Sequence, residues 1–346
     1  MGDIHSDGRN AAKILSLAKI VDERGSWNAG DAIVVQLGDV VDRGPDTKVL
    51  YAWFRKLRKE AEDAGGRFIQ LLGNHEPMQT VGMLDYVHPA DTVAYGGAKQ
   101  RAQAFSETGA DGKYIRNLDT AVIINQTLFV HAGLTPKFAQ MGLQKVNAES
   151  RRVLKEAHAN FQNILWDPNG PLWNRHYSMG PAESACAELE ETFRILGSGV
   201  KRMIVGHTIQ EGGQVRTRCD GKLILADTGA SRFIQNRPTL VEFFADGSVK
   251  ELSIRMGPDS RAVLHSRVLS VSDDADELVE VEELLPDEPV DSEMGASFFD
   301  GEGDIDLLGA LDSEEGGGGG GGRTTEEAEQ TGGVCEGRND DRCLEL

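Results

Sequence analysis

Apolar residues recur along the first 250 positions in two alternating patterns. Ile14, Leu17, Ala18 and Val21 follow helical spacing, and the run DAIVVQL at residues 31–37 then predicts a buried strand. A second helical stripe follows at residues 49–57, and RFIQLL at residues 67–72 predicts the next strand. Further short strands are expected at residues 121–124, 128–130, 201–205 and 223–226. This alternation of strands and helices predicts an α/β fold, which some schemes class as α+β.

The remaining stretches of the first 256 residues add to this picture. Residues 77–117 and 135–194 show mixed or helical patterns, so we expect them to form a helical cap over a site. Residues 239–252 predict a hairpin that turns at Asp246-Gly247. We therefore expect one catalytic domain at residues 1–256.

Composition changes sharply after Met256. Residues 257–346 hold 26 of the 56 acidic residues but five of the 36 basic ones, so the net charge of −20 belongs to this segment. The segment also contains seven consecutive glycines and few large apolar residues after Phe299. Such a composition cannot bury enough surface to offset its ordering entropy, which predicts a disordered acidic tail. Short acidic and apolar clusters within it could bind a protein partner, although a solvating tail is the commoner case.

Charge, hydropathy and cysteines exclude several classes of function. The near-neutral first 256 residues predict no nucleic-acid partner. No run of 18 apolar residues predicts a membrane span, and no signal peptide opens the chain. The four cysteines lack metal-binding spacing, and two of them fall in the tail, so no disulfide framework is expected. These features favour a reducing, cytoplasmic location.

Five short segments rich in His, Asp and Asn carry the chemistry. They are GDIH at residues 2–5, GDVVDRG at 38–44, GNHE at 73–76, HAG at 131–133 and GHT at 206–208. Three of them directly follow predicted strands, and in open α/β sheets the carboxyl ends of strands gather ligand sites. Imidazole and hard oxygen ligands in such a set suit a pair of hydrolytic divalent ions. The sequence therefore predicts a two-metal site for phosphoester hydrolysis.

A role follows for each residue of this set. A two-metal site needs a bridging carboxylate, which we assign to Asp39. The other predicted ligands are Asp3 and His5 for one ion, and Asn74, His131 and His207 for the other. His75 and Asp42 remain as a proton donor and the carboxylate that orients it, and Arg43 would bind phosphate oxygens. Taken singly, each of these residues is more often a turn or core residue, and the prediction rests on their occurring together.

These motifs resemble the signature of calcineurin-like metallophosphoesterases, and GDVVDRG with GNHE resembles the phosphoprotein phosphatase branch. Within that branch the chain is most similar to the Shewanella-like protein phosphatases, through LDYV at residues 84–87, PLWNRHYS at 171–178 and DTGAS at 227–231. The resemblance implies a β-sandwich flanked by helices, the ligands and catalytic pair assigned above, and Arg175 as a second phosphate-binding residue. It also implies hydrolysis of phosphomonoesters on Ser, Thr or Tyr by direct attack of water, with no phosphoenzyme. The metal pair expected is most often manganese, with iron or zinc as alternatives.

Two departures from the family pattern carry expectations of their own. Family members have an apolar strand before the first motif, whereas only Met1 precedes Gly2 here. We therefore expect an open place in the sheet and a fraying segment around Asp3 and His5. Ser6 stands where the family usually has glycine, and it would be strained by about 1 kcal/mol or more if that position needs a positive φ.

Two alternatives remain open at this stage. A hydrolase of dinucleoside polyphosphates would share the Gly-Asp and Gly-Asn-His motifs, although the complete Asp42-Arg43-Gly44 argues against it. A pseudophosphatase that binds partners through its acidic tail would hold one metal ion or none. The substrate expected for the leading hypothesis is a phosphoprotein or phosphopeptide.

Overall fold

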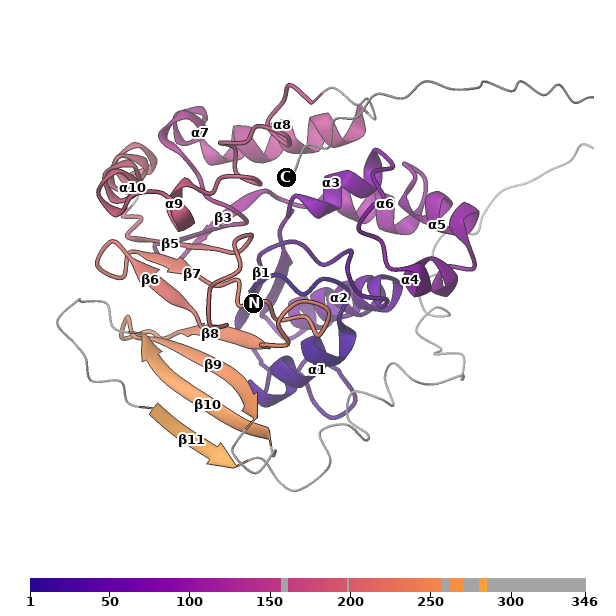
Figure 1. The fold of residues 1–346 in the computed structure, drawn as a ribbon, viewed down its shortest axis with the longest axis horizontal. Coiled ribbons are helices and arrows are strands. Elements are labelled where there is room, and N and C mark those ends of the chain that lie inside the picture. Colours follow the sequence, from indigo (N-terminus) through magenta and orange to yellow (C-terminus); the bar gives the residue numbers. More distant parts are fainter. Residues whose placement is uncertain (157–160, 198, 257–261, 270–279, 285–346) are drawn as a thin grey trace, which may run out of the picture. The chain divides into compact units, whose positions relative to one another are not determined.

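The computed structural model describes residues 1–156, 161–197, 199–256, 262–269 and 280–284 (Figure 1). Its first unit is a parallel strand pair, β1 (Ile33–Gln36) and β2 (Arg67–Gln70), joined through helix α2 (Thr47–Asp63). The apolar stripe predicted at residues 49–57 places Leu50, Trp53 and Phe54 on the buried face of α2. The predicted strand–helix–strand unit is therefore confirmed.

A five-stranded sheet follows, in the order β3-β4-β5-β7-β6. Its strands are β3 (Ala121–Ile124), β4 (Thr127–Val130), β5 (Arg202–Val205), β6 (Arg216–Arg218) and β7 (Leu223–Leu225). The central strands β4, β5 and β7 run parallel, whereas β3 and β6 are antiparallel to their neighbours. All four short strands predicted between residues 121 and 226 are confirmed.

A third, antiparallel sheet has the order β11-β10-β9-β8. It contains the predicted hairpin as β8 (Thr239–Phe243) and β9 (Val249–Met256), and continues into β10 (Ala262–Leu269) and β11 (Glu280–Leu284). The boundary predicted after Met256 therefore falls inside a sheet, because β10 pairs with β9 along its whole length. Local composition could not show that Leu269 finds a core partner in Val249 of β9. Residues 285–346 lie outside the described residues, and their disorder remains a prediction.

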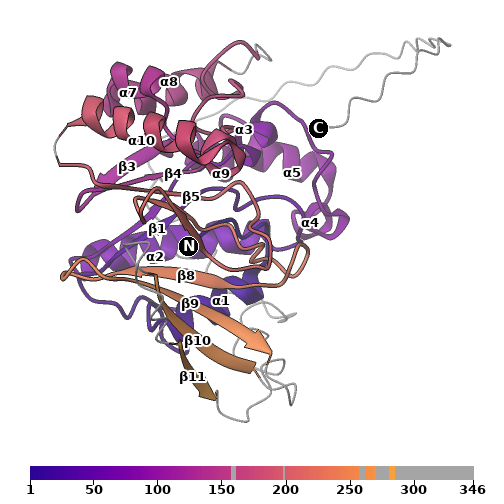
Figure 2. The same ribbon diagram turned by 60° about the vertical axis from the view of Figure 1, so that its left-hand side comes forward.

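The sheets form two layers with a shared core. Residues from β1, β4, β5, β7 and β9 meet between the layers, among them Val35, Phe129, Ile204, Ile224 and Val249. Helices cover the outer faces, as Figure 2 shows for α7, α8 and α10 over β3, β4 and β5. This arrangement is the predicted β-sandwich flanked by helices.

Both stretches predicted as a cap are helical. The first contains α3 (His75–Thr80), α4 (Pro89–Ala94), α5 (Ala98–Phe105) and α6 (Ala110–Ile115). The second contains α7 (Pro136–Met141), α8 (Leu143–Lys155), α9 (His176–Met179) and α10 (Ala182–Leu196). The structure places α7, α8 and α10 against the five-stranded sheet, while α3 and α9 carry the residues that border the site. Within the described residues, no helix is long and apolar enough to cross a membrane.

The segment before helix α1 (Gly8–Leu17) is buried instead of frayed. The Met1 amino group donates to the Val35 carbonyl over 3.0 Å, and its burial lowers the pKa of that group to about 5. The amides of Ile4 and His5 both donate to the Asp39 carbonyl, at 3.1 and 3.0 Å. The expectation of a fraying segment is therefore wrong, because backbone hydrogen bonds to β1 and the loop after it hold the segment in place.

The open place expected in the sheet is present. In the described part of the chain, β1 has only β2 as a neighbouring strand and β8 has only β9. A cavity of about 930 Å³ lies between these two edges.

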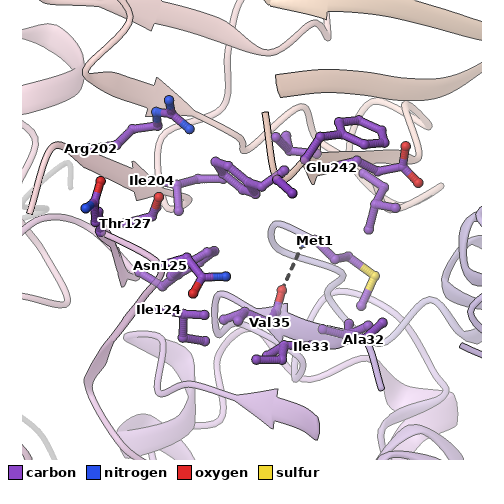
Figure 3. Close-up of a pocket in the computed structure, with 18 of the residues that line it drawn as sticks. Met1, Ala32, Ile33, Val35, Ile124, Asn125, Thr127, Arg202, Ile204 and Glu242 are labelled. Atoms are coloured by element: carbon purple, nitrogen blue, oxygen red, sulfur yellow. Dashed lines mark hydrogen bonds between the residues drawn. The ribbon is translucent and has the colours of Figure 1, made fainter. Parts of the chain in front are cut away.

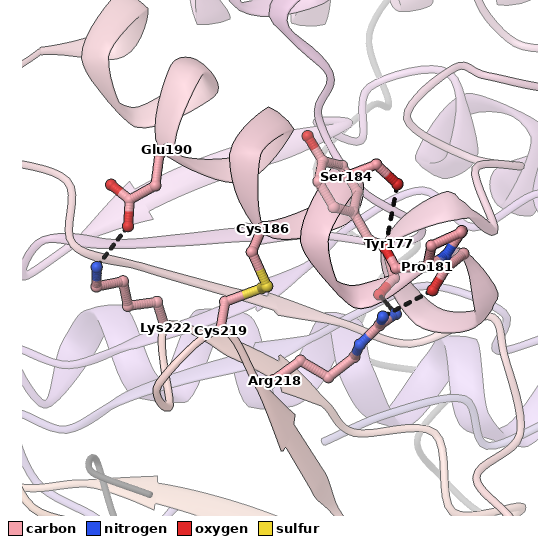
Figure 4. The surroundings of a disulfide bond; sticks show 9 residues. Tyr177, Pro181, Ser184, Cys186, Glu190, Arg218, Cys219 and Lys222 are labelled. Carbon is pink, nitrogen blue, oxygen red and sulfur yellow. Dashed lines mark hydrogen bonds and ion pairs between the residues drawn. A yellow bond between two sulfur atoms is a disulfide. The ribbon is translucent and has the colours of Figure 1, made fainter.

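A disulfide joins Cys186 in α10 to Cys219 in the turn after β6, with the two Cα atoms 5.2 Å apart (Figure 4). Beside it, Arg218 donates to the carbonyls of Tyr177 and Gly180, and Lys222 pairs with Glu190. The sequence predicted no disulfide framework, and it did not anticipate this single bond. A separation of 33 residues carries no local signal, so only the fold brings the two sulfurs together.

Candidate active site

The five motifs converge where parallel strands end. Asp39 follows β1, Asn74 follows β2, His131 follows β4 and His207 follows β5. Asp3 and His5 reach the same place from the segment before α1, through their bonds to the loop after β1. Every predicted metal-binding residue is buried. The tertiary structure therefore brings the whole predicted ligand set together.

The histidine rings are oriented by hydrogen bonds to backbone carbonyls. His5 Nδ1 donates to the Val41 carbonyl at 3.0 Å, and His131 Nδ1 donates to the Leu37 carbonyl at 2.9 Å. A neutral imidazole that donates through Nδ1 keeps its Nε2 lone pair free, which is the form that binds a metal ion. These bonds therefore hold both rings in a ligating tautomer.

Two groups of potential ligands share Asp39. One contains His5, Asp39 and His75, and the other contains Asp39, His131 and His207. Asp39 Oδ2 lies 3.8 Å from His5 Nε2 and 3.4 Å from His131 Nε2. Asn74 Oδ1 lies 2.9 Å from His131 Nε2 and 3.0 Å from His207 Nδ1. Asp39 thus occupies the central position that a bridging carboxylate requires.

Several carboxyl groups are buried close together in the site, an arrangement that favours a bound cation. Burial and the nearby Asp227 and Asp39 raise the pKa of Asp3 well above its usual range, and burial raises the pKa of Asp227 to about 6. In the described structure, Asp3 Oδ1 and His207 Nε2 are buried without a hydrogen-bond partner. Burying carboxylates without a counter-charge is costly. A bound cation would supply that charge, and it would also give these unpaired ligand atoms a partner. The residues therefore fit divalent metal ions.

His75 and Asp42 form a tight pair beside Asp39. His75 Nδ1 lies 2.6 Å from Asp42 Oδ2, and Gln79 donates to the other oxygen of Asp42 over 3.0 Å. Burial lowers the pKa of His75, but Asp39 and Asp42 outweigh this effect and raise it overall. The imidazole can thus carry a proton at the position predicted for the acid.

Glu76 organises the site although sequence analysis gave it no role. Its carboxylate accepts hydrogen bonds from the amides of Gly73, Asp39 and Val40, at 2.7, 3.0 and 2.8 Å. It therefore ties the loop after β1 to the loop after β2. Asp227 was likewise given no role, although its position directly after a predicted strand was the available signal.

Backbone strain also gathers here. Six of the twelve non-glycine residues with positive φ in the described structure belong to the motifs or adjoin them. They are His5, Ser6, Asp39, Asp42, Arg43 and His207. Ser6 has φ of 52°, so the strain expected at this position applies, and its hydroxyl bonds to Thr47 Oγ1 at 2.6 Å. Strain of this kind commonly accumulates at functional sites.

The two predicted phosphate-binding arginines lie at the exposed rim. Arg43 stacks over the Tyr86 ring at 4.3 Å, and that ring lies 5.2 Å from the His75 ring. Arg175 Nη1 donates to the His207 carbonyl at 3.3 Å and to Thr208 Oγ1 at 3.1 Å. Both guanidinium groups are near the cluster, and neither has a carboxylate partner among the described contacts. Tyr86, which had no predicted role, positions Arg43.

Known proteins resemble this chain over 66–72% of its length. The family model described as "Calcineurin-like phosphoesterase" matches residues 1–211. An uncharacterized protein from Schizosaccharomyces pombe is 37% identical over 241 residues, covering 66% of this chain and 71% of that protein. Shewanella-like protein phosphatase 2 from Arabidopsis thaliana is 29% identical, with 72% and 75% covered. Shewanella-like protein phosphatase 1 from Plasmodium berghei is 31% identical, with 67% of each covered.

Solved structures of phosphatases resemble this chain in fold. A cold-active protein-tyrosine phosphatase from a psychrophilic Shewanella species aligns with a TM-score of 0.58 and 27% identity, covering 76% of this chain and 78% of that one. Its I115M mutant aligns with a TM-score of 0.59 and 28% identity, with the same coverage. The fold is thus shared with proteins whose names describe phosphatases.

Proposed function

Because the chain belongs to the calcineurin-like phosphoesterase family, we propose that it is a protein phosphatase that hydrolyses phosphomonoesters on Ser, Thr or Tyr side chains. The family uses two divalent metals, and the relatives support a metal-dependent phosphatase. The observation that carries the finer proposal is the His75–Asp42 pair, which lies directly beside two ligand groups that share Asp39. A proton donor at this position suits an alkoxide or phenoxide leaving group.

The residues that would hold the metals are those of the buried cluster. They are Asp3 and His5 on one side, Asp39 between, and Asn74, His131 and His207 on the other. When bound, two such ions would polarise the phosphoryl group and lower the pKa of water toward 7. Mixed imidazole and oxygen ligands are compatible with manganese, which we propose as the metal, with iron or zinc as alternatives.

The side chains around the cluster divide the remaining tasks. Arg43 and Arg175 would bind phosphate oxygens, since guanidinium groups match them in charge and geometry. His75 would give its proton to the leaving oxygen, while Asp42 fixes the ring by accepting from Nδ1. Glu76 would keep Asp39 in place through three backbone bonds.

The rim favours a macromolecular substrate. Two exposed apolar side chains border the site: the Tyr86 ring lies 5.2 Å from the His75 ring, and Ile209 directly follows the motif that contains His207. Exposed apolar groups beside a polar site commonly contact a larger ligand. Together with the names of the relatives, this rim supports a phosphopeptide or phosphoprotein over a small phosphate ester.

A comparison of substrates tests the proposal. Manganese-loaded full-length chain would be assayed on phosphotyrosine, phosphoserine and phosphothreonine peptides and on diadenosine tetraphosphate. We expect peptide turnover, and we expect His75→Asn to lower kcat by about 10²–10⁴-fold without loss of metal. His88→Asn is the matched control, because asparagine can still cap α4 and His88 is outside the cluster. Preference for the dinucleotide would replace the proposal with a nucleotide hydrolase. A folded chain that holds one ion or none and turns over nothing would indicate a pseudophosphatase.

A further inference from the structure

Ser6 directly follows the candidate ligand His5, and its side chain makes a tight contact. Its hydroxyl oxygen lies 2.6 Å from Thr47 Oγ1, at the first position of α2, and it also donates to the Val40 carbonyl at 3.2 Å. Both Ser6 and Thr47 are fully buried. A buried hydroxyl needs a hydrogen-bond partner, so the two side chains depend on each other.

Thr47 is itself held by a buried ion pair between two helices of the cap. Its amide donates to Asp91 Oδ1 of α4 over 3.1 Å, and Asp91 Oδ2 accepts from Arg101 Nε of α5 at 2.9 Å. Burial raises the pKa of Asp91, and Arg101 together with the amide and side chain of Thr47 opposes that rise. Asp91 and Arg101 are almost fully buried, so moving either one would leave a charge without its partner. The position of Thr47 is therefore fixed by α4 and α5.

The segment before α1 is anchored differently at its two ends. At one end, the Met1 amino group donates to the Val35 carbonyl of β1 at 3.0 Å, as Figure 3 shows. Backbone bonds of this kind do not depend on which side chain the residue carries. At the other end, the bond between Ser6 and Thr47 needs these two side chains, and it acts on the residue next to His5.

The backbone at Ser6 indicates that its hydroxyl has a purpose. Its φ of 52° lies in the left-handed region, which glycine adopts with less strain than serine. Such strain persists where the surrounding contacts fix the conformation, and the bond to Thr47 is one of those contacts. Glycine at this position would relieve the strain, but it could not reach Thr47.

We propose that Ser6 and Thr47 are positioning residues, whose hydroxyl bond holds His5 where it can bind a metal ion. This inference rests on the two-metal site proposed above and does not depend on the substrate. Residues that orient a metal ligand without touching the metal typically contribute about 10–100-fold to metal affinity. Ser6 acts on His5 only through the backbone that they share, so the lower end of this range, about tenfold, is expected.

Manganese binding to the full-length chain tests this proposal without using catalysis. Titration calorimetry would give the two dissociation constants for the unaltered chain, Ser6→Ala and Thr47→Val. We expect each variant to weaken one ion about tenfold, the same ion that His5→Ala removes, and to leave the other ion unchanged. Thr47→Ser should restore the affinity, because it keeps the hydroxyl. Thr120→Val is the matched control, since Thr120 is equally buried and its hydroxyl has no partner in the described structure.

A double variant separates positioning from a general loss of stability. If Ser6 and Thr47 act through one bond, Ser6→Ala combined with Thr47→Val should weaken the ion about tenfold, like each single variant, whereas independent effects would give about a hundredfold. Unchanged affinity in both single variants, equal weakening of both ions, or the hundredfold result would overturn the proposal. An unaltered chain that binds no manganese would overturn the metal site and this inference with it. Two bound ions without turnover of any phosphopeptide would count against the phosphatase alone.

Discussion

The two halves of the candidate metal site are built in different ways. The strand half consists of Asn74, His131 and His207. They lie within four residues of the ends of β2, β4 and β5, and β4 and β5 are paired on both sides. Asp3 and His5, the loop half, lie in a segment without a strand, beside the open edge of β1. The strand half is held by sheet pairing and core packing. The loop half is held by backbone hydrogen bonds to Val35, Leu37, Asp39 and Val40 and by the buried side chains of Met1 and Ile4.

Two ligands can be equally buried and yet differ in how firmly the fold holds them. Asp3 and His131 are both almost fully buried. The loop half has no strand pairing of its own, and local opening is least costly where fewer ordered interactions must break, so the loop half should lose its geometry first.

Metal removal should show the clearest difference in metal affinity between the loop half and the strand half. When manganese-loaded chain is titrated with a chelator, we expect the ion of the loop half to leave first, with an affinity about 10–100-fold below that of the other. Turnover should vanish with this first ion, since both ions contribute to the chemistry. Metal content by mass spectrometry and turnover would be followed in parallel. Simultaneous loss of both ions would contradict the contrast.

The disulfide should stabilise the five-stranded sheet, which carries His131 and His207 of the strand half. Cys186→Ser opens a loop of 33 residues, for which the chain-entropy model gives a loss of about 3–4 kcal/mol. Urea unfolding with and without a reductant would measure it, and the reductant should have no effect on the variant. Metal affinity of the folded protein should be unchanged, because neither sulfur touches the cluster. A changed metal affinity would show that α10 also supports the site.

Glu76→Gln should weaken the link between the halves. The substitution replaces a carboxylate that accepts three backbone bonds, so we expect a loss of about 2–3 kcal/mol in the free energy of unfolding. Glu62→Gln on the exposed face of α2 is the matched control, with an expected change within about 0.5 kcal/mol. If the two variants were equally stable, Glu76 would not organise the loops.

Two glutamines that face each other across β1 and β2 offer the finest test. Gln36 bonds to Gly2 and Gly38, whereas both side-chain polar atoms of Gln70 lack a partner in the described structure. Gln36→Leu should lower the free energy of unfolding by about 1–3 kcal/mol, because it leaves buried backbone groups of Gly2 and Gly38 without partners. Gln70→Leu should be neutral or stabilising, because the Gln70 side chain has no such partners to lose. Urea unfolding would compare them. Equal costs would mean that Gln36 does not anchor the loop half.

Much of the site was predictable because its residues stand in local patterns. Asp39, Asn74 and His131 follow apolar runs, and the position of a motif after a strand is a property of the sequence. Glu76, Gln79 and Tyr86 could not be assigned in this way, since their roles depend on contacts with Asp39, Asp42 and Arg43. The burial of Met1 depends likewise on the edge of β1.

The sequence by itself determined the strand–helix alternation, the five motifs and the candidate ligand set, and the resemblance of those motifs to a family implied the β-sandwich. Hydrophobic periodicity and motif order are encoded locally, so they can be seen in one chain. Tertiary structure alone decided the Cys186–Cys219 bond, the pairing of β10 with β9 and the cavity between β1 and β8. Each of these depends on two segments distant in sequence meeting in space, and the free energy of such contacts comes from packing that no local pattern contains.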